Sequence, residues 1–197
     1  MELADAVRGR RSATRLSDPG PSDEEVYELV TDAATGPDHG LLRPWRLVLV
    51  RGEARQTLGD AFAADLPDDD EAGRARAAAK PLRAPLLVSI ICAPRDVPKV
   101  PPWEQLASAV AMAHNLALLL HDRGWGAMWR TGEPSRSAAV RDLLGVGPDE
   151  QLLGWLYVGT PAAVPAAERP ALDIAEKVSV LGPDGVLSPL AGSLTAR

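Results

Sequence analysis

The chain is poor in cysteine, histidine and aromatic residues, and these scarcities exclude several classes of site. It has one cysteine in 197 residues, Cys92, so it can form neither an intrachain disulfide nor a cysteine-only metal site. The three histidines, His39, His114 and His121, lack the spacing that gathers ligands around zinc. We therefore predict no bound metal.

The chain also lacks an excess of positive charge and a long apolar run. Its 21 Lys and Arg face 27 Asp and Glu, which argues against a general nucleic-acid or anionic-membrane binder. The opening MELADAVRGRRSATR has no apolar region of the signal-peptide kind, and His114 and Asn115 interrupt the longest apolar stretch. We expect a soluble cytoplasmic protein with no nucleic-acid or membrane partner.

Enough apolar residues remain to build a core. Hydrophobic residues make up 46% of the chain and charged residues 24%, and the length suits one compact domain. We predict a single domain over residues 1–197, of which about 162–197 form an extended C-terminal tail rich in Ala and Pro. A tail with so little core of its own is expected to wrap a partner, while 177–181 could pair as an edge strand.

Periodicity and chain-breaking residues predict an α+β order of elements. Ser22 and Glu25 form a capping-box pattern that starts a helix at about 22–35. A short opening helix precedes it. The further expectations are helices at 53–64, 71–80, 103–120 and 135–144 and strands at 46–51, 84–93, 126–131 and 152–159. The order lacks regular βα alternation, and the chain has no GxGxxG or GxxxxGK[ST] motif, so we exclude a Rossmann site and a P-loop.

The helix that begins near Trp103 is the longest, at about 30 Å. Its apolar residues recur at helical spacing, at Leu106, Val110, Ala113, Ala117 and Leu120. The alanine-rich surface lets another helix approach closely. We predict that this helix is central to the fold or lies in a dimer interface.

Arg10, Arg11 and Ser12 stand together after the opening helix. Forked guanidinium donors beside a hydroxyl suit the oxygens of a phosphate. The alternative is a solvated basic turn, which is the commoner fate of an Arg-Arg pair.

Two later loops add donors. His39 lies in a loop stiffened by prolines, although a loop histidine is often only a turn residue. Trp129, Arg130, Thr131 and Gly132 follow one another at the end of a predicted strand, where Gly132 permits close backbone approach; the tryptophan could equally be core. Because no catalytic nucleophile, carboxylate pair or metal ligand set accompanies these loops, they suit a site that grips a reactive cofactor.

The sequence resembles the short bacterial NAD(P)H nitroreductases of the nitroreductase superfamily. The similarity is carried by RRSATR near residue 10, PDHGLLRPW at 37–45, KVPPWEQ at 99–105, GWGAMWRTG at 124–132 and GWLYVGTP at 154–161. It runs over about residues 1–161. The resemblance implies an α+β fold with a central mixed sheet flanked by helices, in an intertwined homodimer with two FMN sites at the subunit interface.

The resemblance also implies roles for residues. Arg10, Arg11 and Ser12 would hold the FMN phosphate and ribityl end, and His39 would come from the other subunit. Trp129, Arg130, Thr131 and Gly132 would line the isoalloxazine, the last two with backbone near the flavin N5.

The implied activity is hydride transfer from NADH or NADPH through the flavin to nitroaromatic, quinone or similar electron-poor acceptors, in a ping-pong scheme. No catalytic side chain is assigned, because the protons can come from water. Two departures from the superfamily stand out: Thr14 lies where a second basic residue is usual, and a C-terminal basic pair has no clear match. Alternatives are another flavin reaction, such as enone reduction, dehalogenation or dehydrogenation, or a flavin-storing or partner-binding domain without activity.

Overall fold

The computed structural model describes residues 2–162, 174 and 177–189. The chain divides into two compact units, Met1–Ala163 and Val164–Arg197. In the second unit, β6 (Ser179–Leu181) pairs with β7 (Leu187–Pro189) as an antiparallel hairpin, so the strand expected at 177–181 forms. The predicted wrapping of a partner by the tail, about 162–197, falls largely on 163–173, 175–176 and 190–197, which lie outside the described residues.

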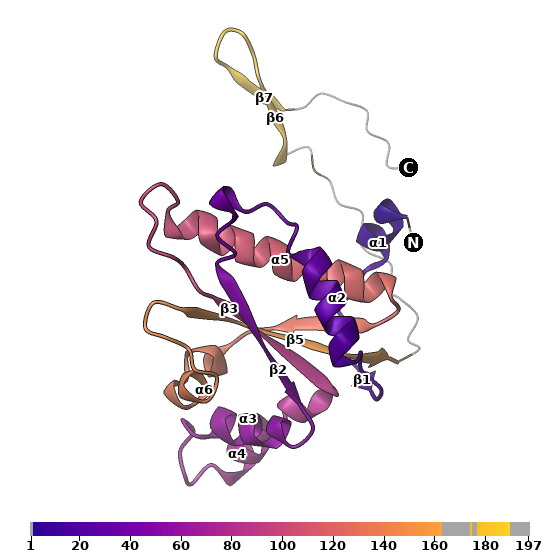
Figure 1. Ribbon diagram of the computed structural model, residues 1–197, viewed down its shortest axis with the longest axis vertical. Helices are drawn as coiled ribbons and strands as arrows, with labels where there is room; N and C mark the ends of the chain where they lie inside the picture. Colours follow the sequence, from indigo (N-terminus) through magenta and orange to yellow (C-terminus); the bar gives the residue numbers. More distant parts are fainter. Residues whose placement is uncertain (1, 163–173, 175–176, 190–197) are drawn as a thin grey trace. The chain divides into compact units, whose positions relative to one another are not determined.

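The first unit is built on a five-stranded sheet in the order β1-β5-β3-β2, with β4 also pairing with β5 (Figure 1). The strands are β1 (Leu16–Ser17), β2 (Trp45–Arg51), β3 (Leu86–Cys92), β4 (Gly126–Arg130) and β5 (Gln151–Pro161). Neighbouring strands are antiparallel, and a single parallel bridge joins Ser12 to Ala127. The α+β class is confirmed. Strand β1 is too short for periodicity to have predicted it.

The helices confirm most of the expected elements. They are α1 (Leu3–Gly9), α2 (Asp23–Ala33), α3 (Ala54–Ala63), α4 (Glu71–Ala78), α5 (Pro102–Asp122) and α6 (Ala138–Leu143), with short 3₁₀ turns η1 (His39–Leu41), η2 (Pro81–Arg83) and η3 (Glu133–Arg136). The helix expected at 135–144 is divided between η3 and α6 because Ser137 has extended backbone.

Helix α2 begins where the capping-box pattern places it. The Ser22 hydroxyl accepts a hydrogen bond from the Glu25 backbone N–H at 3.2 Å. The Glu25 carboxylate accepts a hydrogen bond from Trp125 Nε1 at 2.8 Å. Glu25 therefore ties the start of α2 to the segment that follows α5.

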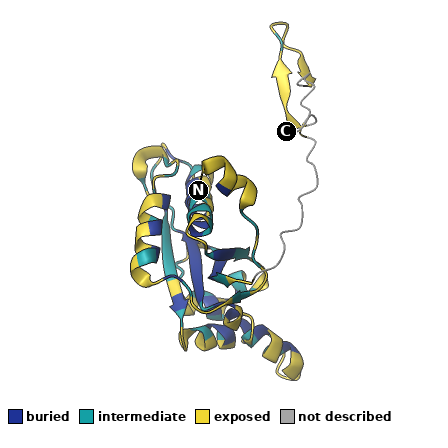
Figure 2. Ribbon diagram, turned by 90° about the vertical axis from the view of Figure 1, so that its right-hand side faces the viewer, coloured by how far each residue is buried: buried dark blue, intermediate teal, exposed yellow. Residues whose placement is uncertain are grey.

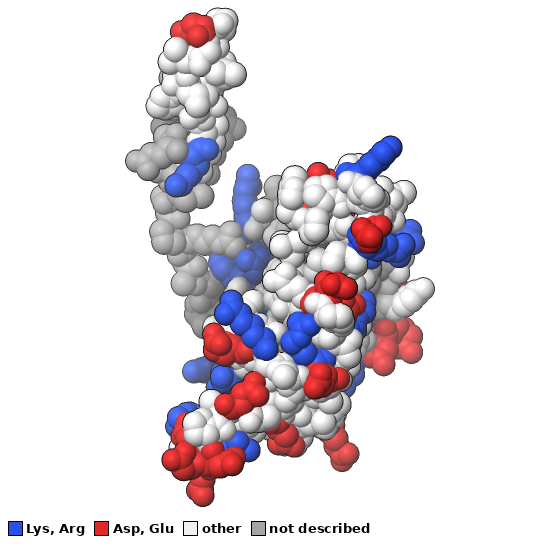
Figure 3. Space-filling view, turned by 90° about the vertical axis from the view of Figure 1, so that its left-hand side faces the viewer, with Lys and Arg blue, Asp and Glu red and all other residues white. Residues whose placement is uncertain are grey.

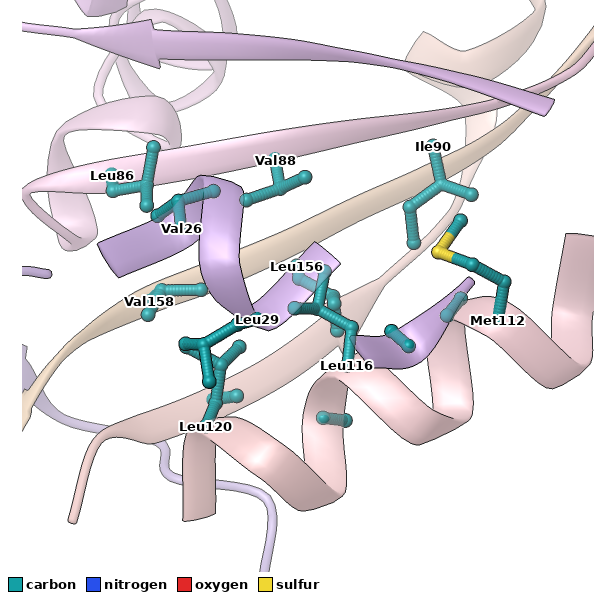
Figure 4. Packing of buried hydrophobic residues seen from close by; sticks show 14 residues of the cluster. Val26, Leu29, Leu86, Val88, Ile90, Met112, Leu116, Leu120, Leu156 and Val158 are labelled. Atoms are coloured by element: carbon teal, nitrogen blue, oxygen red, sulfur yellow. The ribbon is translucent and has the colours of Figure 1, made fainter. Parts of the chain in front are cut away.

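Helices α2 and α5 cover one face of the sheet (Figure 1). Their apolar residues, among them Leu29 and Leu116, pack on inward-facing residues of β3 and β5 such as Val88 and Leu156 (Figure 4). Complete burial of a leucine contributes about 1.5–3 kcal/mol, so this layer is a main source of stability.

Helices α3, α4 and α6 cover the opposite face. Phe62 of α3 and Val140 of α6 pack there with Leu87, Trp155 and Tyr157 of the sheet. Figure 2 shows that burial is concentrated in the sheet and on the sides of the helices that face it. The central strand β3 is buried along its whole length because it lies between two covered faces.

The first half of α5 turns a different side to the core from the one its apolar pattern predicts. Val110 is 40% exposed, whereas Gln105 is 2% exposed. The Gln105 amide accepts from the Arg95 N–H at 2.8 Å and donates to the carbonyls of Arg95 and Val100 at 2.9 Å. Because these bonds satisfy buried backbone groups, a polar residue occupies a position that hydropathy assigns to an apolar one.

Arg46 of β2 and Glu150 form an ion pair beside the loop that leads into β5. Arg46 Nε and Nη2 donate to the two Glu150 carboxylate oxygens at 2.8 and 2.6 Å, and the same carboxylate accepts from the Gly147 N–H at 2.9 Å. The hydrogen bond from Arg46 lowers the pKa of Glu150 below its ordinary value, although burial acts in the opposite direction. The pair is partly buried, so solvent screens it only partly.

We expect this pair to make stability depend on acid pH. Because the pKa of Glu150 is lower in the folded chain than in the unfolded chain, its contribution is complete above the unfolded pKa and is lost as pH falls through the folded pKa. Glu150→Gln should lower the free energy of unfolding by about 1–2 kcal/mol at neutral pH and by much less in acid. Urea unfolding at both pH values tests this, with the exposed Asp149→Asn as control. An equal loss at both pH values would contradict the prediction.

Candidate functional site

Arg10, Arg11 and Ser12 lie between the end of α1 and the outer edge of β4. Ser12 forms a parallel bridge with Ala127, and the Ala13 N–H donates to the Ala127 carbonyl at 3.0 Å. These backbone contacts hold the predicted phosphate-binding residues beside the strand that carries the second group of predicted site residues.

The Arg11 guanidinium folds back on α1. Its Nη1 donates to the carbonyls of Arg8, Gly9 and Arg10, which are among the carbonyls left without helical partners at the end of α1. Arg11 Nε is buried and has no hydrogen-bond partner among the described residues. Arg11 therefore acts as a helix cap and keeps one donor for an acceptor supplied from elsewhere.

Trp129 and Arg130 point to opposite faces of β4. Trp129 packs on the α2 and α5 side, and its Nε1 donates to the Leu153 carbonyl at 3.0 Å. The Arg130 guanidinium lies over the Tyr157 ring on the other side, 5.2 Å from the ring centroid. Strand geometry requires this, since successive side chains alternate between faces. The two residues nevertheless both line one cavity of about 320 Å³, together with Thr131.

The backbone after β4 has free space beside Gly132, whereas β5 packs closely against the end of β4. Gly132 has φ +132°, and a Cβ there would meet only Pro134 Cδ, at 3.9 Å. Behind it, Gly154 of β5 has φ +106°, and a Cβ there would lie 2.3 Å from the Arg130 carbonyl oxygen. Gly154 thus lets β5 support the end of β4 closely, while the N–H groups near Thr131 and Gly132 stay accessible.

A cavity of about 530 Å³ lies at the end of β4. Trp129, Thr131 and Ser135 line it together with Val110 and Leu153. Thr131 is four residues beyond Ala127, the partner of Ser12, so about 13 Å of strand separates the phosphate-type donors from the cavity. We call this space, defined by these five residues, the larger cavity. Strand β4 thus runs from the backbone beside Arg10, Arg11 and Ser12 to this partly aromatic cavity.

His39 lies at the other end of α5. Its Nδ1 is 2.6 Å from the Glu104 carboxylate in the first turn of the helix. Gly9, next to the predicted phosphate residues, lies beside His121 in the last turn. Glu104 and His121 are seventeen residues apart, about 26 Å of helix. A single protomer therefore does not bring His39 and Arg10 together.

The loop that carries His39 is held in an unusual backbone conformation. Leu41 and Arg43 have φ of +52° and +47° although neither is glycine. The Asp38 carboxylate accepts from the N–H groups of Leu42 at 3.2 Å and Arg43 at 2.7 Å. Left-handed residues cost about 1–3 kcal/mol each and persist where neighbouring contacts impose them. Asp38 is thus the residue that shapes this loop.

Sequence reasoning missed the roles of Asp38 and Glu104. An aspartate that opens a turn is a recognised signal for bonds to the backbone a few residues later, so Asp38 could have been identified. The pairing of Glu104 with His39 joins residues 65 positions apart, and no local pattern announces it.

Charges of both signs are interspersed on the face shown in Figure 3, so that face presents no extended field of one sign. Among the described residues, no helix combines the length and the apolar character that a membrane span needs. A cytoplasmic location stays a prediction.

Sequence comparison finds relatives over most of the chain. The sequence model of the nitroreductase family matches residues 7–160. YdjA of Escherichia coli (strain K12), which carries the name of an NAD(P)H nitroreductase, is 32% identical over 165 residues, or 82% of this chain and 89% of YdjA. A Haemophilus influenzae protein with the same kind of name is 24% identical over 92% of this chain and 100% of its own length.

Solved structures share the fold. A nitroreductase-like family protein from Bacillus cereus superposes with a TM-score of 0.81 at 24% identity, covering 91% of this chain and 96% of that one. NfnB from Sphigopyxis sp. strain HMH, described as an FMN and NADPH-dependent nitroreductase, gives a TM-score of 0.72 at 23% identity over 92% and 100% of the two chains. At these identities the structural likeness shows the fold alone.

Proposed function

The chain belongs to the nitroreductase family, and from that premise we propose that it binds FMN and transfers hydride from NADH or NADPH to nitroaromatic, quinone or similar electron-poor acceptors. The comparisons support an NAD(P)H-dependent oxidoreductase of the nitroreductase type. The acceptor class and the order of the half-reactions are our inference.

One observation carries the FMN assignment: the anion donors and the larger cavity lie along one strand, about 13 Å apart. That separation suits a phosphate joined to a ring system by a five-carbon chain. At the phosphate end, Arg11 Nε is a buried donor that has no acceptor among the described residues. The open backbone at Gly132 gives the ring end room for close approach. The residues present therefore fit FMN.

The parts of the site divide as follows. Arg10, Arg11 and Ser12 would hold the phosphate and the ribityl chain, because charged donors give phosphate its strongest hydrogen bonds. Trp129 would lie against the ring system, and the backbone of Thr131 and Gly132 would face its central edge.

A contact of Arg130 with the flavin stays a prediction. Its side chain lies against Tyr157, on the face of β4 away from Trp129. Arg130 also lines a cavity of about 320 Å³ with Trp129 and Thr131, two of the predicted flavin residues.

We infer that His39 contacts the flavin of a partner subunit. Within one chain it lies at the end of α5 away from Arg10. Its hydrogen bond with Glu104 fixes the ring, so Nε2 is left for a ligand. An intertwined homodimer would place each His39 over the neighbouring protomer's site.

Bound FMN would supply a two-electron carrier that accepts hydride from the nicotinamide and returns it to an acceptor. The protein's contribution is then to bind, orient and exclude water. Trp129, held by its bond to Leu153, offers a rigid wall for planar ligands, and apolar residues such as Val110 keep the cavity partly dry. Because no side chain in this cavity is a carboxylic acid or histidine, we assign the protons to water. One cavity serving both substrates in turn implies a ping-pong scheme.

The experiment is the visible spectrum of the purified protein. We expect oxidised-flavin bands that bleach anaerobically with NADH or NADPH and return when a nitroaromatic or a quinone is added. A colourless protein that ignores added FMN would contradict the cofactor. Bleaching with return only by an enone, a halogenated ring or another acceptor would assign a different flavin reaction. A yellow protein that does not bleach would favour flavin storage.

A further inference from the structure

The His39 ring is paired with a carboxylate that a long helix carries. Its Nδ1 lies 2.6 Å from Glu104 Oε2, and the two residues are 65 positions apart in the chain. Glu104 stands in the first turn of α5, a helix of 21 residues, and its backbone N–H donates to the Pro101 carbonyl at 3.0 Å. The group that faces His39 is therefore presented by a regular element and not by a flexible loop.

The two side chains differ in exposure. The side chain of Glu104 is 27% exposed, whereas that of His39 is 59% exposed. Within the described part of the chain, the His39 ring makes its hydrogen bond through Nδ1, and its Nε2 makes none. The pair thus holds one nitrogen of the ring against α5 and leaves the other for a group outside this protomer.

The loop around His39 has other contacts that give it its shape. The Asp38 carboxylate accepts from the N–H groups of Leu42 at 3.2 Å and Arg43 at 2.7 Å. An ion pair as exposed as this one contributes at most about 1 kcal/mol to the free energy of unfolding. What Glu104 does to the ring is therefore a better account of its position than what it adds to stability.

The chemistry of the pair decides where the ring carries its proton. A neutral histidine has one N–H group and one bare nitrogen, and an ionised carboxylate can only accept hydrogen bonds. Nδ1 of His39 must therefore carry the proton and donate it to Glu104. Nε2 of the neutral ring is then a hydrogen-bond acceptor. Glu104 thus sets both the orientation and the tautomer of His39.

We propose that Glu104 is a positioning residue for cofactor binding, which holds His39 with Nε2 as the acceptor for a hydrogen-bond donor of the partner subunit's FMN. The inference rests on the proposed function, in which His39 contacts that flavin. Most polar atoms of oxidised FMN are acceptors, and its donors are the ribityl hydroxyls and the N3–H of the ring system. A neutral His39 held by Glu104 can bond only to these donors.

The tautomer of His39 is measured by a long-range proton–nitrogen spectrum of the full chain. The chain has three histidines, so each ring can be resolved, and His39→Ala assigns the signals. In mildly alkaline solution, where imidazole is neutral, we expect the proton of His39 on Nδ1. Glu104→Met should move it to Nε2, the form that free histidine favours. An Nε2–H form in the unchanged protein, or a ring protonated on both nitrogens, would overturn the proposal.

The consequence for the cofactor is measured by fluorescence titration with FMN. Glu104→Met should weaken FMN binding by about three- to ten-fold, the effect of one hydrogen bond. His39→Ala should weaken it at least as much. Adding Glu104→Met to His39→Ala should cause no further loss, because Glu104 acts through His39. Unchanged affinity in Glu104→Met, or additive losses in the double variant, would overturn the proposal.

Two further variants separate positioning from charge. Glu53→Met is the matched control, because Glu53 is an exposed carboxylate at the start of α3 that makes no capping bond. It should change neither the tautomer of His39 nor the affinity for FMN. Glu104→Asp keeps a negative charge at the start of α5 but is one methylene shorter, so it should behave as Glu104→Met does. Full rescue by aspartate would show that charge at the helix start suffices and would overturn the proposal.

Titration with FMN, riboflavin and lumiflavin identifies the donor. Lumiflavin lacks the ribityl chain, so a loss in Glu104→Met with the first two flavins alone would assign the contact to a ribityl hydroxyl. An equal loss with all three would assign it to the ring N3–H. If Glu104 sets the tautomer of His39 but the protein binds none of the three flavins, the proposed function fails together with the flavin contact, while the positioning of His39 by Glu104 stands.

Discussion

Gly154→Ala is expected to lower the free energy of unfolding by about 3–5 kcal/mol. The backbone at Gly154 has φ +106°, which costs an alanine about 1–3 kcal/mol. The new Cβ would also lie 2.3 Å from the Arg130 carbonyl oxygen and 3.1 Å from Thr131 Cγ2. Backbone cannot yield as a flexible side chain does, so the end of β4 must move away. Urea unfolding measures the loss.

The same change should reach the site. Arg130 and Thr131 are the residues displaced, and the predicted flavin contacts lie at Thr131 and Gly132. We therefore expect weaker FMN binding in Gly154→Ala even where the protein is folded. Fluorescence titration with FMN measures this.

Gly124→Ala is the matched control for the backbone term. Gly124 also has a positive φ, +85°, but a Cβ there would meet nothing within 4 Å. Gly124→Ala should lower the free energy of unfolding by about 1 kcal/mol and leave FMN binding unchanged. Equal losses of unfolding free energy in Gly124→Ala and Gly154→Ala would mean that the close approach of β5 to β4 contributes nothing to the loss at Gly154.

Sequence patterns predicted elements whose cause is local. The cap at Ser22 and the apolar run of β3 depend on neighbours within a few residues, and the structure confirms both. The buried side of α5 depends instead on a loop several residues away, whose backbone Gln105 satisfies. Hydropathy ranks glutamine as a surface residue, so it cannot reveal a polar group that is buried because it is paired.

The candidate site, like the fold, has some features with a local cause and others that depend on distant packing. That Arg10 to Ser12 would lie beside the residues at 129–132 followed from the resemblance, and the Ser12 bridge to Ala127 explains it physically. The placement of Arg130 on the other face of β4 could have been foreseen, since strand alternation separates it from Trp129. The resemblance, which implies that His39 comes from the other subunit, requires His39 and Arg10 to lie apart within one chain. No local pattern predicts the distance itself, because it is set by two loops at opposite ends of one helix.

Arg10→Ala is expected to weaken FMN binding by about 10–100-fold while leaving the fold and the proposed dimer intact. A charge-assisted hydrogen bond to phosphate contributes about 1.5–3 kcal/mol, which corresponds to that range. The measurement is flavin occupancy of the purified variant, followed by titration with FMN and by sizing of the dimer. An occupancy equal to that of the unchanged protein would show that the phosphate lies elsewhere.

Two neighbouring variants decide what an effect at Arg10 means. Arg8→Ala removes the same charge from an exposed position on α1 and should change neither occupancy nor stability. Arg11→Ala should lower both, because its guanidinium caps the carbonyls that end α1 as well as offering its buried Nε. If Arg10→Ala lowers stability as much as Arg11→Ala, Arg10 supports the fold and its loss of flavin is indirect. If Arg10→Ala is as stable as Arg8→Ala while its flavin occupancy falls, Arg10 binds the phosphate directly.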